Sequence, residues 1–284
     1  MSTSIHQALL SATQQLVDQH DTASLDAELL LAHVLHKSRA WLYTWPEQEL
    51  DAKQLEQFEQ FEHRRLNGEP VAHLIGTQEF WSLSLQVTPD TLIPRPETEL
   101  LVELALERIP ANASWRIADL GTGSGAIALA VAKERPACQV IATDKSTAAL
   151  DIAKQNARLN QVGNVTFLPG DWLVAVKDEP PFEMILSNPP YIKEDDPHLL
   201  QGDVRFDPDS ALQAGAEGLD DLQQIIEQAL AHLKPGGWLL LEHGYDQQNA
   251  VMQLLQQAGY EQIEDYPDLA GQPRVAAGHK SLKR

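Results

Sequence analysis

The chain has 284 residues, of which 43% are hydrophobic, and it carries 41 acidic against 21 basic side chains for a formal net charge of −20. The acidic excess is spread along the chain: residues 1–90 hold 13 acidic and 5 basic side chains, and residues 91–284 hold 28 and 16. This charge disfavours tight binding of duplex nucleic acid and suits a basic protein partner better.

Cysteine, histidine and hydropathy patterns narrow the class of protein further. The single cysteine, Cys138, excludes an internal disulfide and a cysteine-rich zinc site. The ten histidines lack the spacing of metal ligands, so we expect no metal. The first residues lack the basic and apolar regions of a signal peptide, and no apolar run approaches the ~20 residues of a membrane helix. We therefore expect a cytoplasmic protein that makes no membrane contact. A monomer is a separate expectation, which these patterns do not determine.

Residues 1–70 are expected to form a small helical bundle. Apolar residues recur at helical spacing in three stretches, which predicts helices at 5–16, 25–36 and 51–66. Asn67 and Gly68 then provide a natural end for the third helix. A bundle of this length lies within the range of independent domains.

A short β-rich segment follows the bundle. Apolar and polar residues alternate within 73–89, which predicts two strands on either side of Gly76-Thr77. We interpret residues 71–94 as a β-hairpin linker. The remainder, residues 95–284, is then a separate catalytic domain.

Within that domain the predicted strands and helices alternate. Strands are expected at 116–120, 139–144, 164–170, 182–188 and 237–243, with two more near 260–266 and 274–277. Helices are expected at 97–108, 124–134, 147–160, 220–233 and 247–258. This alternation implies an α/β fold with a mostly parallel sheet and helices on both faces.

A glycine-rich turn, DLGTGSG (119–125), joins the first of these strands to its helix. Gly121, Gly123 and Gly125 let the backbone approach a ligand, and the start of the helix directs free N–H groups at it. The spacing is not the GxGxxG of dinucleotide sites. Asp119 suits the ammonium and sulfonium of S-adenosylmethionine better than a pyrophosphate. A tight turn without any ligand is the alternative.

Two more residues lie at the ends of the next strands. Asp144 ends the second strand, where an acidic side chain can hydrogen-bond ribose hydroxyls. Alone, Asp144 could equally be a helix-initiating residue, and the glycine turn favours the ribose role. Trp172 follows the third strand, where an adenine would lie in such a sheet. It could contact the ring or be an ordinary core tryptophan, and both interpretations stay open.

The fourth strand leads into Asn188-Pro189-Pro190-Tyr191, at the sheet edge where ligands bind. A planar NH₂ group is a poor nucleophile until two acceptors hold its hydrogens and aim its nitrogen at a methyl group. The Asn188 side-chain oxygen and the Pro189 carbonyl are suitable acceptors, since proline stiffens the backbone. Tyr191 offers a flat face on which an amide or base can stack. The alternative is a rigid, asparagine-capped loop.

Together, the glycine turn, Asp144 and NPPY resemble the class I S-adenosylmethionine-dependent methyltransferases that act on planar nitrogens. Further stretches are similar to the HemK/PrmC family of release factor glutamine methyltransferases: LIPRPETE (92–99), ALQAGAEGLD (211–220), LLLEHG (239–244) and DLAGQPRVAAGH (268–279). The resemblance covers nearly the whole chain and is strongest in the catalytic half. It implies a Rossmann-like, seven-stranded sheet and an N-terminal bundle that helps to engage the release factor.

The resemblance also implies an activity and a set of site residues. It implies methyl transfer from S-adenosylmethionine, with S-adenosylhomocysteine as product, to the side-chain amide of the glutamine in the Gly-Gly-Gln motif of bacterial class I release factors. The catalytic residues would be Asn188, Pro189 and Tyr191, and Pro190 would join them in binding the glutamine. The implied cofactor site consists of Gly121, Thr122, Gly123, Ser124, Gly125, Asp144, Trp172 and Asn188. Arg95 and Glu97 either line the active site or form structural ion pairs, and their spacing assigns them no role.

Two other functions are compatible with parts of this pattern. NPPY also occurs in adenine-amino DNA methyltransferases, and related motifs occur in RNA guanine methyltransferases, where the same acceptors would hold a flipped base. The dispersed acidity and the lack of a basic target-recognition insertion argue against a nucleic-acid substrate. A non-catalytic cofactor-binding scaffold is disfavoured by the intact NPPY.

Residues 194–209 carry six acidic side chains and one arginine. The segment is either a solvated loop or a surface for a basic partner. Under the second interpretation, reversing these charges should weaken release-factor methylation more at low salt than at high salt, because exposed charges are screened. Initial rates measured over a range of ionic strength test this. An equal loss at every salt concentration would argue against contact with the partner.

Overall fold

The computed structural model describes residues 3–282, and these fall into two compact units. One unit runs from the N-terminus to Thr77 and includes the later segment Gly202–Phe206, and the other comprises Gln78–Gln201 and the residues from Asp207 onward. The structure does not test the three functional domains predicted from the sequence, which span residues 1–70, 71–94 and 95–284. Among residues 3–282, no helix has both the length and the apolar character needed to cross a membrane.

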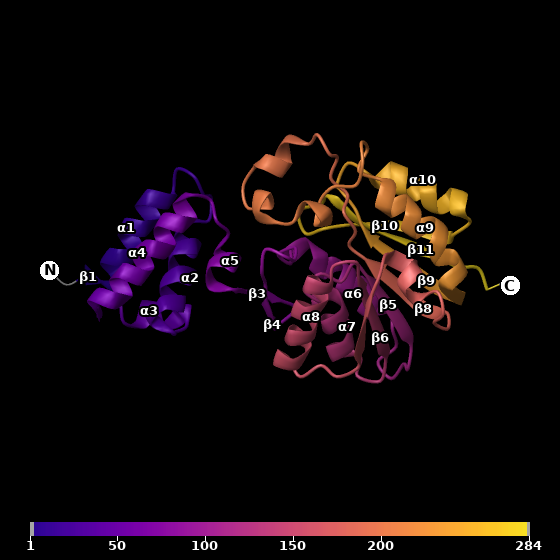
Figure 1. The fold of residues 1–284 in the computed structure, drawn as a ribbon, viewed down its shortest axis with the longest axis horizontal. Helices are drawn as coiled ribbons and strands as arrows, with labels where there is room; N and C mark the ends of the chain where they lie inside the picture. The colour runs from indigo at the N-terminus through magenta and orange to yellow at the C-terminus, as the bar shows by residue number, and fades with distance from the viewer. Residues whose placement is uncertain (1–2, 283–284) are drawn as a thin grey trace. The chain divides into compact units, whose positions relative to one another are not determined.

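The N-terminal unit is a helical bundle, drawn in indigo and purple in Figure 1. Its helices are α1 Ile5–Leu16, α2 Ala23–Leu35, α3 Arg39–Thr44, α4 Ala52–Leu66 and α5 Val71–Ile75, and two short antiparallel strands, β1 Thr3–Ser4 and β2 Glu49–Leu50, pair beside them. Capping boxes begin α1 at Ser4 and α4 at Asp51, satisfying backbone donors that a helix start leaves free. Phe58 of α4 is buried with Leu30 and Leu31 of α2.

A buried arginine connects this bundle to the segment Gly202–Phe206. Arg65 Nε donates to Asp26 Oδ2 at 2.8 Å, and Arg65 Nη1 donates to Asp203 Oδ1 at 2.7 Å. The Arg65 side chain is only 5% exposed. Arg205 Nη2 also donates to the carbonyl of Asn67 at 2.7 Å. A part of the acidic segment 194–209 is therefore fixed by ion pairs instead of being freely solvated.

The predicted position of the hairpin was wrong. Residues 73–75 belong to helix α5, which Gly76 ends in a left-handed conformation at φ 75°. The strands are β3 Thr77–Phe80 and β4 Leu83–Gln86, and the turn between them is Trp81-Ser82, at φ 48° and 60°. Positive φ at both central residues suits the right-handed twist of a two-residue hairpin. The sequence did not indicate this turn, because turn positions with positive φ normally carry glycine, asparagine or aspartate.

The larger unit has the predicted α/β fold. Its strands are β5 Arg116–Leu120, β6 Gln139–Asp144, β7 Val165–Pro169, β8 Phe182–Ser187, β9 Leu233–Glu242, β10 Glu261–Pro267 and β11 Pro273–His279. Its α-helices are α6 Glu99–Arg108, α7 Ala126–Glu134, α8 Thr147–Leu159, α9 Asp220–His232 and α10 Gln248–Ala258. The seven strands are ordered β10-β11-β9-β8-β5-β6-β7. Strand β11 runs antiparallel to both of its neighbours, and the strands from β9 to β7 pair in parallel.

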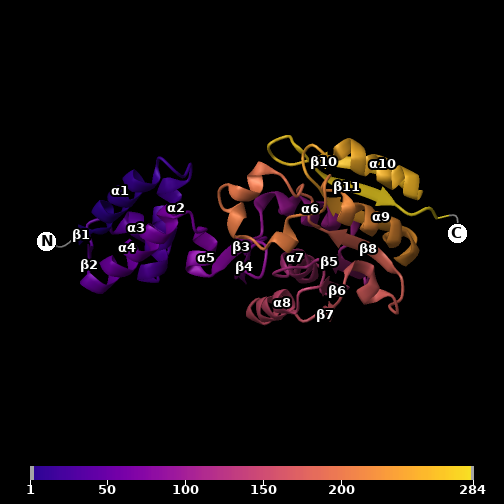
Figure 2. The same ribbon diagram turned by 45° about the horizontal axis from the view of Figure 1, so that its top comes forward.

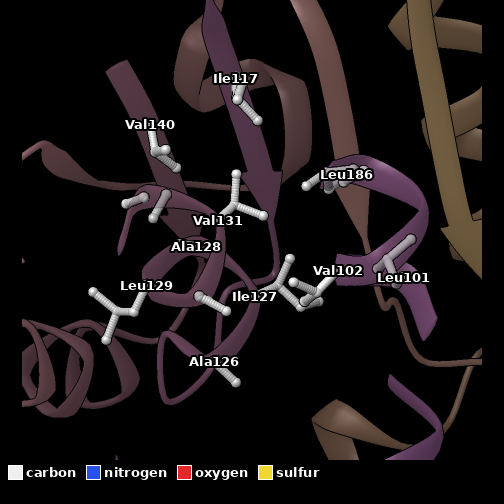
Figure 3. Close-up of a cluster of buried hydrophobic side chains, with 14 of the residues drawn as sticks. Leu101, Val102, Ile117, Ala126, Ile127, Ala128, Leu129, Val131, Val140 and Leu186 are labelled. Carbon is white, nitrogen blue, oxygen red and sulfur yellow. The ribbon is translucent and has the colours of Figure 1, made fainter. Parts of the chain in front are cut away.

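Helices cover both faces of this sheet (Figures 1 and 2). Helices α6, α7 and part of α8 pack on one face, and α9 and α10 pack on the other. The side chains of β8 alternate between the two cores: Met184 and Leu186 join the first, and Ile185 joins the second. Figure 3 shows part of the first core, with Ile127 of α7 beside Val102 of α6. Burial on both faces explains why these strands read as continuous apolar runs.

Candidate active site

A cleft of about 650 Å³ opens at the carboxyl ends of β5, β6, β7 and β8. Strand β5 lies between β6 and β8, so the order of the strands reverses beside it, and such a switch point is where open α/β sheets bind ligands. Residues from several loops line the cleft: Asp90, Thr91, Leu92, Gly121, Gly123, Asp144, Lys145, Ser146, Ala149, Gly170, Asp171, Trp172, Asn188, Pro190, Pro208, Ser210 and Ala211.

The glycine turn forms the floor of the cleft beside a tryptophan. Gly121 has φ +70°, and a Cβ atom there would come within 2.9 Å of the Trp172 ring. A glycine is therefore required by both the backbone conformation and the close approach. The turn is held from behind by Asn156, whose Nδ2 donates to the carbonyls of Ser124 at 2.9 Å and Gln86 at 3.0 Å. Asn156 lies inside a predicted helix, and nothing local in the sequence indicated this role.

The other residues of the turn are structural in this conformation. Thr122 and Ser124 are buried, and Gly125 precedes the first turn of α7 at φ +88°. The Thr122 hydroxyl donates to Asp119 Oδ2 at 2.6 Å. Gly121 and Gly123 thus provide the backbone surface of the cleft, and direct cofactor contacts by Thr122, Ser124 and Gly125 stay a prediction.

Asp119 is completely buried beneath the turn. Its Oδ2 accepts hydrogen bonds from Thr122 and from the N–H of Ala128, whereas Oδ1 has no partner within residues 3–282. Burial raises the pKa of Asp119 from 3.8 to about 7, although the two hydrogen bonds act in the opposite direction. Asp119 does not line the cleft, so its suitability for a positively charged ligand stays a prediction.

The raised pKa of Asp119 predicts a dependence of stability on pH. Between pH 3.8 and about 7 the folded chain retains a proton that the unfolded chain releases, so stability falls as pH rises and levels off above about 7. Relative to the wild type, Asp119→Asn should therefore gain about 2 kcal/mol of unfolding free energy between pH 5 and 7. Urea denaturation of both ligand-free proteins at several pH values measures the difference. A difference that does not change with pH would contradict the raised pKa.

Asp144 and Trp172 both face the cleft, as the sequence suggested. Asp144 Oδ2 accepts the N–H of Gly123 at 2.9 Å, and Oδ1 accepts the N–H of Ser146 at 2.8 Å. Each carboxylate oxygen keeps a further lone pair for a ligand hydroxyl. Trp172 is 7% exposed, belongs to the second core and donates from Nε1 to Asp221 at 3.1 Å. The two interpretations of Trp172 are thus compatible, since one ring contributes to the core and to the cleft wall.

NPPY follows β8 at the same edge of the sheet. The hydroxyl of Ser187 donates to the carbonyl of Leu120 at 2.7 Å, which connects the start of NPPY to the start of the glycine turn. Asn188 and Pro190 line the cleft. Tyr191 is partly buried, and its hydroxyl donates to Glu242 Oε1 at 3.2 Å. The roles of Pro189 as an acceptor and of Tyr191 as a stacking surface stay predictions.

Two walls of the cleft were not expected from the sequence. They come from residues 90–92 and 208–211, and buried Asp207 joins them. Asp207 Oδ1 accepts the N–H of Ile93 at 3.0 Å, and Oδ2 pairs with Arg95. Arg95 therefore forms a structural ion pair, which was one of its two open interpretations, and Glu97 is exposed. Only Leu92 and Ala211, at the ends of two family-like stretches, gave any sequence signal for these walls.

Comparison with known proteins agrees with this geometry. Residues 7–76 match the PrmC N-terminal domain, and residues 98–201 match the methyltransferase small domain. The release factor glutamine methyltransferase of Coxiella burnetii is 49% identical over 98% of this chain and 99% of its own length. The chain belongs to the release factor glutamine methyltransferase family. The Escherichia coli release factor glutamine methyltransferase is likewise 49% identical, over 89% of this chain and 91% of its own length.

Solved structures support the fold independently. A methyltransferase from Pyrococcus furiosus superposes with a TM-score of 0.55 at 20% identity, covering 78% of this chain and 99% of that one. At this identity the likeness concerns the fold alone. The resemblance to the release factor glutamine methyltransferase family drawn from the sequence is therefore confirmed, as are the fold class and the assignment as a methyltransferase.

Proposed function

We propose that this chain transfers a methyl group from S-adenosylmethionine to the side-chain amide nitrogen of the glutamine in the Gly-Gly-Gln motif of class I peptide chain release factors. The observation that supports this most is that the glycine turn and Asn188 line the same cleft. A second support is that relatives about half identical to this chain are called release factor glutamine methyltransferases. The acidic surface also suits a protein substrate better than a nucleic acid.

The cleft has the residues that this cofactor needs. Gly121 and Gly123 give close backbone approach, Asp144 can accept from ribose hydroxyls, and Trp172 offers an apolar ring for the adenine. Bound S-adenosylmethionine supplies an activated methyl group on a sulfonium, so no strong base is needed to start the transfer.

The chain itself would orient the glutamine amide. An amide nitrogen has its lone pair delocalised, so the enzyme must hold its two hydrogens and aim the nitrogen. The Asn188 side-chain oxygen and the Pro189 carbonyl are the acceptors proposed for this purpose. Placing the two reactants in line can contribute ~7–11 kcal/mol toward lowering the barrier.

A labelled-methyl experiment tests the proposed substrate. The purified chain is incubated with S-adenosylmethionine labelled in its methyl group and, separately, with a release factor, its Gly-Gly-Gln to Gly-Gly-Ala variant, duplex DNA and RNA. We expect label only in the unaltered release factor, and on the glutamine nitrogen by mass spectrometry. Label that enters only DNA or RNA would reject the protein substrate in favour of an amino-directed nucleic-acid methyltransferase.

The structure also sharpens the charge-reversal experiment on residues 194–209. Asp203 and Asp207 are committed to Arg65 and Arg95, so reversing them would disturb the fold. Glu194, Asp195 and Asp209 are exposed. Lysine substitutions at these three positions therefore test contact with a basic surface of the release factor without removing an ion pair of the fold.

A further inference from the structure

The side chain of Gln247 connects three loops of the larger unit. Its Nε2 donates to the carbonyl oxygens of Tyr191 and Gly218, each at 3.0 Å, and its Oε1 accepts the N–H of Gly244 at 2.9 Å. Tyr191 belongs to NPPY, Gly218 lies in the loop before α9, and Gly244 lies in the loop after β9. Gln247 is 6% exposed and does not line the cleft. The sequence placed it only at the start of a predicted helix.

The direction of the Gln247 amide is fixed by main-chain groups. A carbonyl oxygen can only accept and a main-chain N–H can only donate. The NH₂ group must therefore face Tyr191 and Gly218, which uses both of its hydrogens, and the oxygen must face Gly244. Gln247 is the N-cap residue of α10, yet its side chain makes no capping hydrogen bond to that helix. The amide is thus committed to the three loops instead of to the helix that follows it.

Gly218 brings its loop into contact with the end of NPPY. It has φ +69°, and a Cβ atom there would lie 2.4 Å from the carbonyl oxygen of Tyr191 and 3.0 Å from Gln247 Nε2. Both the backbone conformation and the close approach therefore require glycine. Any larger residue would separate Gln247 from the carbonyl oxygens that it holds.

Main-chain hydrogen bonds extend this contact along the chain. The N–H of Ile192 donates to the carbonyl of Leu212 at 2.9 Å, and the N–H of Ala214 donates to the carbonyl of Ile192 at 3.0 Å. Leu212 directly follows the cleft wall at 208–211. The residue after NPPY is thus paired with the segment that continues this wall, and the Gln247 hydrogen bond to NPPY lies one residue before this pairing.

We propose that Gln247 is a positioning residue that fixes the downstream end of NPPY, so that the loop has its productive shape before the glutamine amide arrives. The upstream end is held separately, by the hydrogen bond from Ser187 to the carbonyl of Leu120. Gln247 does not line the cleft, so it acts through NPPY and not on the substrate. The inference rests on the proposed function, because NPPY is the loop proposed to orient the amide. Residues that lock a site from behind in this way set how precisely it is held.

Substitutions of similar length test the proposal. Gln247→Met removes the amide, and Gln247→Glu keeps an oxygen for the N–H of Gly244 but directs a carboxylate at two carbonyl oxygens. Gln248→Met is the matched control, because Gln248 is the next residue, is half-buried and donates to Asp265 at 3.1 Å instead of to NPPY. For each protein, kcat and KM toward a release factor, the Kd of S-adenosylmethionine and the Tm are measured.

The expected result is a loss of turnover that the control does not share. Both Gln247 variants should lower kcat by ~10²-fold, the effect of a small misplacement of the reacting groups. The KM for the release factor and the Kd of S-adenosylmethionine should stay within a few-fold of the wild type, because the cleft residues are unaltered. Gln248→Met should keep kcat within a few-fold. A role in stability alone would lower the Tm but leave kcat unchanged in folded protein well below the Tm.

Hydrogen exchange reports the position of the loop directly. The amide hydrogens of Ile192 and Ala214 should exchange at least ~10-fold faster in both Gln247 variants, because the lost hydrogen bonds had held their pairing closed. The amides of strand β5 should keep their wild-type rates in the same samples. Gln248→Met should leave the exchange of Ile192 unchanged.

Each outcome supports or overturns a defined statement. Wild-type methylation of the release factor must be seen first, and its absence would reject the proposed function itself. With an active wild type, normal kcat in both Gln247 variants, or an equal loss in Gln248→Met, would overturn the inference alone. A loss of kcat without faster exchange at Ile192 would overturn it too, because the position of the loop would not be the cause. If Gln247→Glu does not fold, Gln247→Met compared with Gln248→Met decides.

Discussion

Replacing Asn188 with alanine is expected to lower the turnover number for glutamine methylation by roughly 10²–10³-fold, the usual effect of removing one preorganised polar group from an active site. The Kd of S-adenosylmethionine should stay within a few-fold, because the role proposed for Asn188 is mainly toward the substrate amide. Single-turnover rates with saturating cofactor and release factor, together with calorimetric titration of the cofactor, check both statements. Near-normal turnover would defeat this assignment.

Replacing Asp144 with alanine is expected to affect binding of the cofactor more than turnover, the reverse of Asn188→Ala. Its carboxylate accepts from Gly123 and Ser146 and faces the proposed ribose position. Its loss should raise the Kd of the cofactor first, while turnover at saturating cofactor falls less than in Asn188→Ala. Comparing the two variants separates cofactor binding from amide orientation. If both variants lost cofactor affinity and turnover to the same extent, the separation of roles would be wrong.

The local pattern of the sequence was sufficient for the seven strands of the main sheet and for the position of the two loops that we propose to carry the chemistry. Strand β5 and the glycine turn were placed correctly because a buried apolar run followed by closely spaced glycines has few other solutions. Parallel connectivity alone predicted that NPPY lies at the same edge, because parallel strands all end on one side of a sheet.

The supporting contacts could not be predicted, because they join residues far apart in the chain. Asn156 holds Ser124 from 32 positions away, Asp207 holds Ile93 from 114 positions away, and Asn188 meets Thr98 from 90 positions away. No periodicity or turn rule relates such pairs. These contacts hold the loops of the site in place. The sequence therefore predicted the residues proposed to act in the reaction, but not the residues that position them.

The segment Gly202–Phe206 is a further case of this kind. It follows NPPY in the chain, yet it belongs to the same compact unit as the N-terminal helices. Its attachment depends on Arg65, which interacts with Asp26, Asp203 and the carbonyl of Glu69. From the sequence, Arg65 was one basic residue at the end of an amphipathic helix. Its partner Asp203 was one of six acids in a segment interpreted either as a solvated loop or as a surface for a basic partner.

Replacing Arg65 with methionine is therefore expected to destabilise the N-terminal unit by about 3–5 kcal/mol, because Asp26 would be left as an unpaired buried charge. Arg64→Met is the matched control at the preceding position of α4. The Arg64 side chain is 49% exposed and pairs with Glu69 at the surface, so its loss should cost about 1 kcal/mol or less. Hydrogen exchange of α2 and α4, combined with urea denaturation, measures the two changes.

The double variant Asp26→Leu/Arg65→Met tests whether an unpaired buried charge or lost packing causes the instability of Arg65→Met. An apolar pair leaves no buried charge, so it should recover most of the stability that Arg65→Met loses. Hydrogen exchange of the Gly202–Phe206 segment should nevertheless stay fast in the double variant, because Asp203 still lacks its arginine. If the double variant were as unstable as Arg65→Met, lost packing of the arginine stem would be the cause instead. If Arg65→Met cost no more than Arg64→Met, the buried ion pair would have no special part in joining this segment to the helices.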